Sequence, residues 1–326
     1  MFPKPKGYLL ELVREKRHHL PNGRFINPWF EQEAPALTKI IKWKVSHLRE
    51  RSRAFIPVTK PSFEILADHP GPLVCFLGHG SVLLKLSGRI FLLDPILGHI
   101  GGLIKRRVPP PLLPQELPSV DFVIYSHAHR DHFDLVTLAA LHGQPVLISP
   151  LNFRKYLSNT YPLVELDWLE VYESNGWAAR AVPVQHWSKR GLMDTNVALW
   201  AGFVLESDDF RVFFGGDTGY FFGFRELGEA FGPFDLALLP TGAFLPRWLM
   251  APFHMSPEEA VKAGEELKAR WVMPIHWGAY RLGDEELDDP PKLFKRCALG
   301  SQVKPLVLYP GEIAIFENGK VIYSPH

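Results

Sequence analysis

The chain has 326 residues, of which 46% are hydrophobic and 22% charged, and its formal net charge is +1. These values are typical of a globular protein with a sizeable core, and they point to no fibrous or strongly charged class. Only two cysteines occur, which argues against a disulfide framework and against a cysteine-ligated metal. No signal peptide or membrane-spanning segment is apparent, so we expect a cytoplasmic protein, at most peripheral to a membrane.

The first 62 residues are predicted to form a basic arm, followed by one main domain over residues 63–326. Lys and Arg outnumber Asp and Glu by 13 to 5 in residues 1–60, about +8, whereas the rest of the chain has 23 against 30, about −7. An amphipathic helix is predicted over residues 36–53, with an apolar face formed by Leu37, Ile41, Val45 and Leu48. The arm could pack on the acidic body, or it could contact anionic lipid or another polyanion.

The main domain is predicted to contain short strands first in runs and then in alternation with helices. Strands are expected at residues 73–78, 81–86, 89–94, 121–126, 145–149, 168–172, 178–184, 197–206, 211–215 and 271–278. One helix is predicted at 134–141 and another at 257–269, where Ser256 is a good N-cap and Glu259 completes a capping box. This order predicts a layered α/β protein.

Metal-capable side chains follow several of these strands. The stretch "YSHAHRDHFD" at 125–134 comes directly after an apolar strand. In such a turn His127 and His129 could point to one side while Asp131 and His132 point to another, so one segment could serve two adjacent metals. The alternative is a polar surface loop in which the histidines gather by chance. Other metal-capable residues follow strands in the same way. One of them, Asp94, comes before this stretch of the sequence, and three come after it: His186, Asp217 and His276.

This succession resembles the metallo-β-lactamase superfamily over residues 73–280. The marks are "LLDP" around Asp94, "HAHRDH", and then His186, Asp217 and His276. The fold that the resemblance implies is an αββα sandwich, in which two mixed β-sheets are flanked by helices and the site lies at one edge.

A narrower resemblance covers nearly the whole chain. "GRFINPW", "FLGHGSVLL", "QHWSKRGLMD", "FGGDTGY" and "HMSPEEA" are similar to the N-acylphosphatidylethanolamine-hydrolysing phospholipase D family.

The resemblance implies a site with two zinc ions, for which manganese or iron could substitute. His127, His129 and His186 would hold the first ion, Asp131, His132 and His276 the second, and Asp217 would bridge both. The set of imidazoles and carboxylates suits zinc. Asp94 is expected beneath the histidine loop, where its carboxylate would orient an imidazole ring.

The implied reaction is phospholipase D-type hydrolysis of a phospholipid such as N-acylphosphatidylethanolamine, in which a metal-bridging hydroxide attacks phosphorus. Asp131 and Asp217 would be the catalytic carboxylates. Candidates for contact with the substrate are His254, Arg247, Lys189, Tyr220 and Phe222. The aromatic residues of "GYFFGF" could line an acyl-chain groove or could pack between sheet and helix.

Two other functions agree with the same residues. A general hydrolase of this fold, such as a lactonase or another esterase or phosphodiesterase, would use the same metals. A non-catalytic binding protein is a weaker alternative, because the set of seven ligands is intact. We expect a phosphodiester substrate and no nucleic acid as partner, and a homodimer is a further expected assembly.

Overall fold

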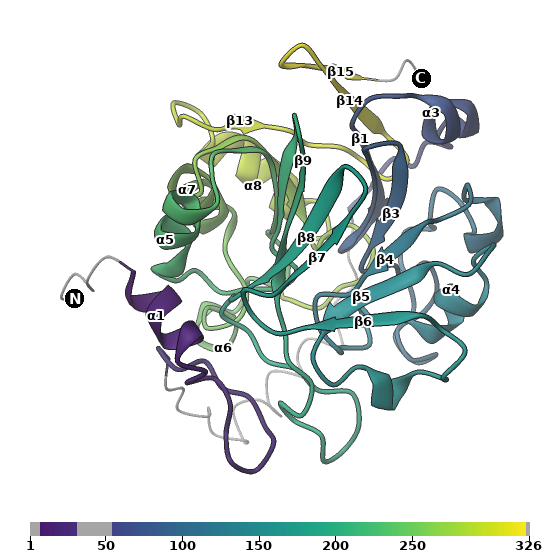
Figure 1. The fold of residues 1–326 in the computed structure, drawn as a ribbon. Helices are drawn as coiled ribbons and strands as arrows, with labels where there is room; N and C mark the ends of the chain where they lie inside the picture. The colour runs from purple at the N-terminus through teal and green to yellow at the C-terminus, as the bar shows by residue number, and fades with distance from the viewer. Residues whose placement is uncertain (1–6, 31–53, 324–326) are drawn as a thin grey trace.

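Two mixed β-sheets lie face to face, and helices cover their outer sides (Figure 1). This computed structural model describes residues 7–30 and 54–323. Helices α5, α7 and α8 cover one sheet and α4 covers the other (Figure 1). The predicted αββα sandwich is therefore confirmed.

The first sheet has eight strands in the order β15-β14-β1-β2-β3-β4-β5-β6. Its strands are β1 (Leu73–Gly78), β2 (Ser81–Leu86), β3 (Arg89–Leu93), β4 (Phe122–Ile124), β5 (Val146–Pro150), β6 (Leu163–Leu166), β14 (Ile313–Glu317) and β15 (Lys320–Tyr323). Strands β1 and β2 are buried along their whole length, because one face meets the second sheet and the other meets α3 and the loops outside. Strands β3 to β6 pair in parallel, so their carboxyl ends meet at one edge.

The second sheet has seven strands in the order β13-β12-β11-β10-β9-β8-β7. Its strands are β7 (Val171–Ser174), β8 (Trp177–Val182), β9 (Gly202–Ser207), β10 (Arg211–Phe214), β11 (Phe234–Pro240), β12 (Ala269–Ile275) and β13 (Lys304–Pro305). Strands β10, β11, β12 and β13 are parallel neighbours, and helices connect each of them to the next. The side chains on the inner faces of both sheets form one large core cluster.

The helices are short and lie outside the sheets or at their ends. They are α1 (Tyr8–Arg14), α3 (Phe63–Asp68), α4 (Leu135–Ala139), α5 (Gly223–Ala230), α6 (Arg247–Met250), α7 (Pro257–Glu266) and α8 (Asp289–Cys297), with 3-10 turns η1 (Pro114–Glu116) and η2 (Arg154–Tyr156). The predicted capping box of α7 is present: Ser256 Oγ accepts from the backbone N–H of Glu259, and the Glu259 carboxylate accepts from that of Ser256. Helix α7 ends earlier than predicted, because Lys268 adopts φ 58° and Ala269 already begins β12.

Two predicted strands are misplaced, for physical reasons that the structure shows. The strand expected at 168–172 is wrong at its start, since residues 167–170 form the turn between β6 and β7. The strand expected at 197–206 begins only at Gly202. Just before it, the backbone N–H groups of Leu199 and Ala201 donate to carbonyls of Leu151 and Ser126. Those residues belong to loops of the first sheet, so the segment crosses between the sheets before it joins the second one.

The described part of the first 62 residues packs against the main domain. Leu9, Leu10 and Val13 of α1 and Ile56 belong to the same core cluster as the sheets. The backbone N–H groups of Leu9 and Leu10 donate to the buried carboxylate of Glu226. The amphipathic helix predicted over 36–53 lies outside the described residues. Within residues 7–30 and 54–323, no helix has the length and apolar character to cross a membrane.

Candidate metal centre

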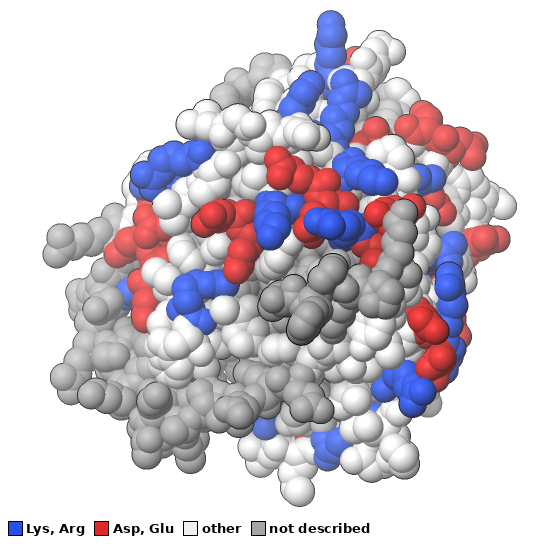
Figure 2. Space-filling model, turned by 90° about the vertical axis from the view of Figure 1, so that its left-hand side faces the viewer, with Lys and Arg blue, Asp and Glu red and all other residues white. Residues whose placement is uncertain are grey.

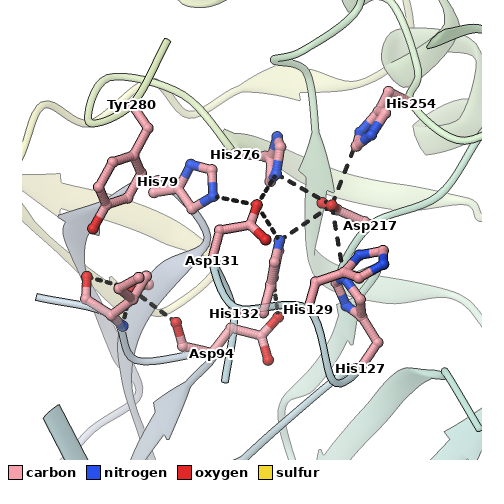
Figure 3. A network of polar contacts seen from close by, with 12 residues as sticks. His79, Asp94, His127, His129, Asp131, His132, Asp217, His254, His276 and Tyr280 are labelled. Atoms are coloured by element: carbon pink, nitrogen blue, oxygen red, sulfur yellow. Dashed lines mark hydrogen bonds and ion pairs between the residues drawn. The ribbon is translucent and has the colours of Figure 1, made fainter. Parts of the chain in front are cut away.

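Seven metal-capable side chains converge where strands of both sheets end, and all of them except His186 are labelled in Figure 3. The loop after β4 supplies His127, His129, Asp131 and His132 from the eight-stranded sheet. The segments after β8, β10 and β12 supply His186, Asp217 and His276 from the seven-stranded sheet. The site therefore lies on the seam between the two sheets, and neither sheet supplies it alone.

The Oδ2 atom of Asp217 lies at the centre of this group. It is 3.1 Å from Nε2 of His132 and 3.2 Å from Nε2 of His276. The Nε2 atoms of His127 and His186 each lie 3.9 Å from the same oxygen. The carboxylate is only 3% exposed, so these nitrogen atoms surround it in the interior of the protein.

The remaining donors separate into two subsets around this central carboxylate. Ligand atoms of His127, His129 and His186 all lie within 4.8 Å of one another. Those of Asp131, His132 and His276 form a second subset, in which Asp131 Oδ2 is 3.6 Å from His132 Nε2 and 3.5 Å from His276 Nε2. The two sets of three ligands that the resemblance implies stay a prediction, and the second group here also includes a ligand atom of His79.

Several donor atoms in the cluster are buried and have no hydrogen-bond partner among the described residues. They are Nε2 of His127, His129, His132 and His276, and Oδ1 of Asp217. Buried polar atoms in proteins nearly always have a partner, so this number of unsatisfied atoms in one place needs a reason. Convergent imidazole nitrogens with carboxylates are the donor set that zinc and similar divalent ions prefer. These residues therefore fit a metal centre.

A buried carboxylate beneath the histidine loop fixes the orientation of two rings. Asp94 accepts from the backbone N–H of Ser126 at 2.7 Å and also from the Ser126 hydroxyl. The Nδ1 atom of His132 lies 2.7 Å from Asp94 Oδ2, and that of His127 lies 2.8 Å from Ser126 Oγ. The serine hydroxyl gives its only hydrogen to Asp94, so it accepts from His127 Nδ1–H. His127 thus directs an unprotonated Nε2 toward the centre. Burial alone would lower the pKa of His132, but the Asp217, Asp131 and Asp94 carboxylates raise it well above its usual value, so a metal must displace a proton from this ring.

Burial and the neighbouring charges set the protonation of the cluster. Burial lowers the pKa of His129 to about 4, and it lowers the pKa of His254 to about 4, which leaves lone pairs free to bind a cation. Burial alone would lower the pKa of His276, but the Asp217 and Asp131 carboxylates raise it to about 9. A metal that binds here must displace the proton from His276, so metal affinity falls as the pH falls.

Of the predicted substrate residues, His254 comes nearest to the cluster. Its Nδ1 lies 3.9 Å from Asp217 Oδ2, and its ring stacks on that of His276 at 5.3 Å between centroids. Arg247 supports the same segment from behind: Nη1 donates to the His254 carbonyl at 2.9 Å, and Nη2 pairs with Glu259 at 2.7 Å. Lys189 lies half-buried in the segment that follows His186.

Tyr220 and Phe222 have packing partners away from the cluster. The Tyr220 hydroxyl donates to the Glu266 carboxylate at 2.9 Å, and the Phe222 ring lies 6.0 Å from that of Tyr8. These contacts join the segment just before α5 to α7 and to α1. The interpretation that they pack between structural elements therefore describes them better than the acyl-chain groove.

Three residues near the cluster were not identified from the sequence. His79, in the turn between β1 and β2, has its Nε2 3.2 Å from Asp131 Oδ2. The Trp187 ring lies 4.5 Å from that of His129, and the Phe253 ring lies 5.9 Å from that of His186. His79 could have been found, because it directly follows a strand as the other donors do. Nothing in the sequence distinguishes the two aromatic residues from core residues.

The chain is similar to known proteins over most of its length. A family model described as a beta-lactamase superfamily domain matches residues 89–277. N-acyl-phosphatidylethanolamine-hydrolyzing phospholipase D 1 of Caenorhabditis elegans is 36% identical, over 77% of this chain and 79% of that protein. A metal-dependent hydrolase of Thermococcus onnurineus is 33% identical, over 74% of this chain and 97% of that protein. Among solved structures, the metallo hydrolase Igni18 of Ignicoccus hospitalis matches with a TM-score of 0.60 at 21% identity, over 76% of this chain and 98% of that one.

Proposed function

Since the chain belongs to the β-lactamase superfamily and is a metal-dependent hydrolase, we propose that it is a zinc-dependent phosphodiesterase of the phospholipase D type. The proposed substrates are phospholipids that resemble N-acylphosphatidylethanolamine. One observation carries this proposal: six imidazole and carboxylate side chains, in two adjacent subsets, converge around the carboxylate of Asp217. The relative from Caenorhabditis elegans, named for such a hydrolysis, supports the choice of substrate.

Two ions would be held by the two subsets described above. His127, His129 and His186 would hold the first, Asp131, His132 and His276 the second, and Asp217 would contact both. The absence of thiolates and the several imidazoles favour zinc, while manganese or iron could replace it. When bound, the pair of ions would supply an activated water and neutralise the charge of the phosphodiester.

The protein's own residues would orient this chemistry. Asp94 and Ser126 hold the rings of His132 and His127, so the donors are in place before the substrate arrives. The reaction joins the water oxygen to phosphorus and breaks the bond from phosphorus to the N-acylethanolamine oxygen, which takes up a proton. His254 is half-buried beside Asp217 and faces the donors, so it is suited to hydrogen-bond a phosphoryl oxygen or the leaving group.

An aromatic wall beside the first subset suits an apolar substrate. Trp187 and Phe253 pack 6.0 Å apart, next to His129 and His186. Both side chains are partly exposed, so they could cover the first methylene groups of a lipid. We propose that this wall, rather than Tyr220 and Phe222, contacts the acyl chain.

We also propose that residues 63–326 form the catalytic domain, and that residues 1–62 form a basic arm that packs on it and can also contact anionic membranes. This proposal is supported by the charge of the first 60 residues, which contain 13 basic and only 5 acidic residues. By contrast, Lys and Arg are interspersed with Asp and Glu on the face drawn in Figure 2. Binding to vesicles with and without anionic lipid, at rising salt, tests the arm, because screening weakens such contacts.

The proposed reaction is tested by substrate profiling of the zinc-loaded protein. A panel would contain N-acylphosphatidylethanolamine, a soluble phosphodiester, a lactone and a β-lactam. We expect phosphatidic acid and N-acylethanolamine as products, and in ¹⁸O-labelled water the label should enter the phosphate. Label in the alcohol product, or activity on lactones alone, would contradict the proposal. The Asp217→Asn variant is the inactive control.

A further inference from the structure

The turn between β1 and β2 carries a buried histidine for which the proposed reaction gives no role. His79 is 1% exposed, and its Nε2 lies 3.2 Å from Oδ2 of Asp131. A carboxylate can only accept a hydrogen bond, so the proton of this contact sits on His79 Nε2. The contact is seen from close by in Figure 3, where His79 lies between Tyr280 and Asp131.

The backbone of this turn is held on both sides by the cluster itself. The His79 N–H donates to the Trp277 carbonyl at 2.8 Å, and the His276 N–H donates to the His79 carbonyl at 2.8 Å. On the other side, a Cβ placed on Gly80 would lie only 3.2 Å from Cε1 of His132, so the turn packs closely against that ring. His79 is therefore placed between two residues of the second donor subset.

The ring of His79 is also held from behind. The Tyr280 ring meets it edge-on at 4.9 Å, and the Tyr280 hydroxyl donates to the Gly98 carbonyl at 2.6 Å. Arg106 Nη2 donates to the Leu77 carbonyl at 2.7 Å, which fixes the end of β1 just before the turn. A side chain packed in this way cannot swing away from Asp131 without disturbing its neighbours.

We infer that His79 is a positioning residue, whose Nε2–H holds the Asp131 carboxylate so that Oδ2 faces His132 and His276. Asp131 lies on the loop after β4 and is the most exposed of the carboxylates near the cluster, with 18% of its side chain in solvent. One lone pair of Oδ2 would accept from His79, and the other would remain for the cation. This inference rests on the proposed metal centre, and it assigns His79 to the second ion.

Zinc retention by single variants tests the role of His79. His79→Phe keeps a ring but removes the donor, His79→Asn is too short to reach Asp131, and His79→Gln keeps an N–H at about the position of Nε2. We expect the second zinc to bind about 10–100-fold more weakly in the Phe and Asn variants, while the first is unchanged. The Gln variant should recover most of that loss.

The measurements are zinc content after dialysis against graded chelator, and the visible spectrum of the cobalt(II)-substituted protein, which reports the geometry of the second site. His142→Gln, at a histidine whose Nε2 bonds the Gln115 carbonyl on the exposed surface, is the matched control. Thermal melting of the metal-free proteins tests whether each variant folds. If the larger Phe side chain prevents folding, the Asn variant replaces it in the test, because its side chain adds no volume.

Each outcome decides for or against the inference. Equal retention of both zinc ions by wild type and by the Phe and Asn variants would overturn the positioning role alone. A Gln variant as weak as His276→Ala would also overturn it, because His79 would then be a ligand itself. A wild-type protein that takes up no metal would overturn this inference together with the proposed function.

Discussion

Histidines gather around a buried aspartate at two places in this molecule, and the two clusters are built differently. The first is the metal cluster around Asp217. The second, which we call the N-terminal clamp, consists of Lys16, His18 and His19 around Asp167. By composition alone, both clusters contain groups that could hold a metal.

In the N-terminal clamp both Nε2 atoms and the Lys16 ammonium meet an oxygen of Asp167, and a single buried nitrogen of the clamp, His18 Nδ1, has no hydrogen-bond partner among the described residues. His18 Nε2 lies 2.7 Å from Asp167 Oδ1, and His19 Nε2 lies 2.8 Å from Oδ2, where the Lys16 ammonium also binds. These are ordinary hydrogen-bond lengths, and a lysine at the same oxygen would repel a cation. The His18 ring also stacks on Trp168, at 4.3 Å between centroids. The clamp therefore fastens the N-terminal segment to the turn between β6 and β7.

In the metal cluster the nitrogens point at a shared centre and not at separate acceptors. The distances to Asp217 Oδ2 are 3.1 to 3.9 Å, and the buried Nε2 atoms of His127, His132 and His276 have no hydrogen-bond partner among the described residues. The comparison teaches that residue types do not distinguish a binding cluster from a structural one. The direction and the satisfaction of the donor atoms do.

Among the changes that distinguish the two clusters, Asp217→Asn should have the largest effect, on zinc binding and on activity. The change removes the negative charge that both donor subsets share, so the protein should lose both zinc ions. We expect kcat/KM to fall by more than about 100-fold, which is the largest effect usual for groups that only support a metal ligand. Zinc analysis and phosphodiester assays measure this. Asp167→Asn is the matched control and should keep both ions. Loss of zinc in that control would mean that the two clusters are not distinct.

Asp167→Asn should instead affect stability. It leaves the buried His18 without its charged partner, so we expect the free energy of unfolding to fall by about 2–4 kcal/mol. Lys16 and His19 add little, because their side chains are 49% and 37% exposed. Urea unfolding measures the change, and activity per folded molecule should stay the same. A stability equal to that of wild type would show that the N-terminal clamp contributes nothing.

Asp94→Asn should have an intermediate effect on metal binding. The amide is a poorer acceptor for His132 Nδ1–H than the carboxylate, so the second ion should bind about 10–100-fold more weakly. Chelator titration of the zinc protein checks this value.

Ser126→Ala, which removes the hydroxyl between Asp94 and His127, should weaken the binding of the first ion and leave the binding of the second unchanged. Equal weakening of both ions by both variants would contradict the separate roles.

The smallest expected effect is the pH dependence of the N-terminal clamp. Burial alone would raise the pKa of Asp167, but His18 and Lys16 hold it well below its usual range. A depressed folded-state pKa stabilises the protein above the unfolded pKa, near 4, and that contribution is lost as the pH falls further. In metal-free protein, the part of the stability gap between wild type and Asp167→Asn that comes from this carboxylate should be constant from pH 8 to 5. It should close below pH 4, by at most about 1.4 kcal/mol per pH unit.

Much of the metal cluster could be predicted because its donors follow strands that are visible in the sequence. His127, Asp217 and His276 come after apolar runs, and parallel strands bring such ends to one edge. His79 also directly follows a strand, but its contact with the cluster depends on the bridge to Trp277, which joins the two sheets across almost two hundred residues. No local sequence pattern predicts a backbone pairing between residues so far apart in the chain.

The N-terminal clamp was unpredictable for the same reason. "KRHHL" is a polar, basic segment, and Asp167 directly precedes the strand predicted at 168–172. Only the folded chain brings His18 to Asp167, 149 positions apart. The strand expected at 168–172 failed at this place, because Trp168 is buried beneath His18 and its indole N–H donates to the Trp200 carbonyl. The tertiary contact overrode the local strand preference.

The position of the metal cluster on the seam between the sheets also links metal supply to the lifetime of the protein. An ion held by both sheets binds the folded chain and not the unfolded one, so it adds about 2.7 kcal/mol of stability at a hundred times its dissociation constant. Chains made under metal starvation would lack this contribution and would expose unfolded segments more often to proteases. We expect the abundance of the protein in a cell, as well as its activity, to follow the available metal.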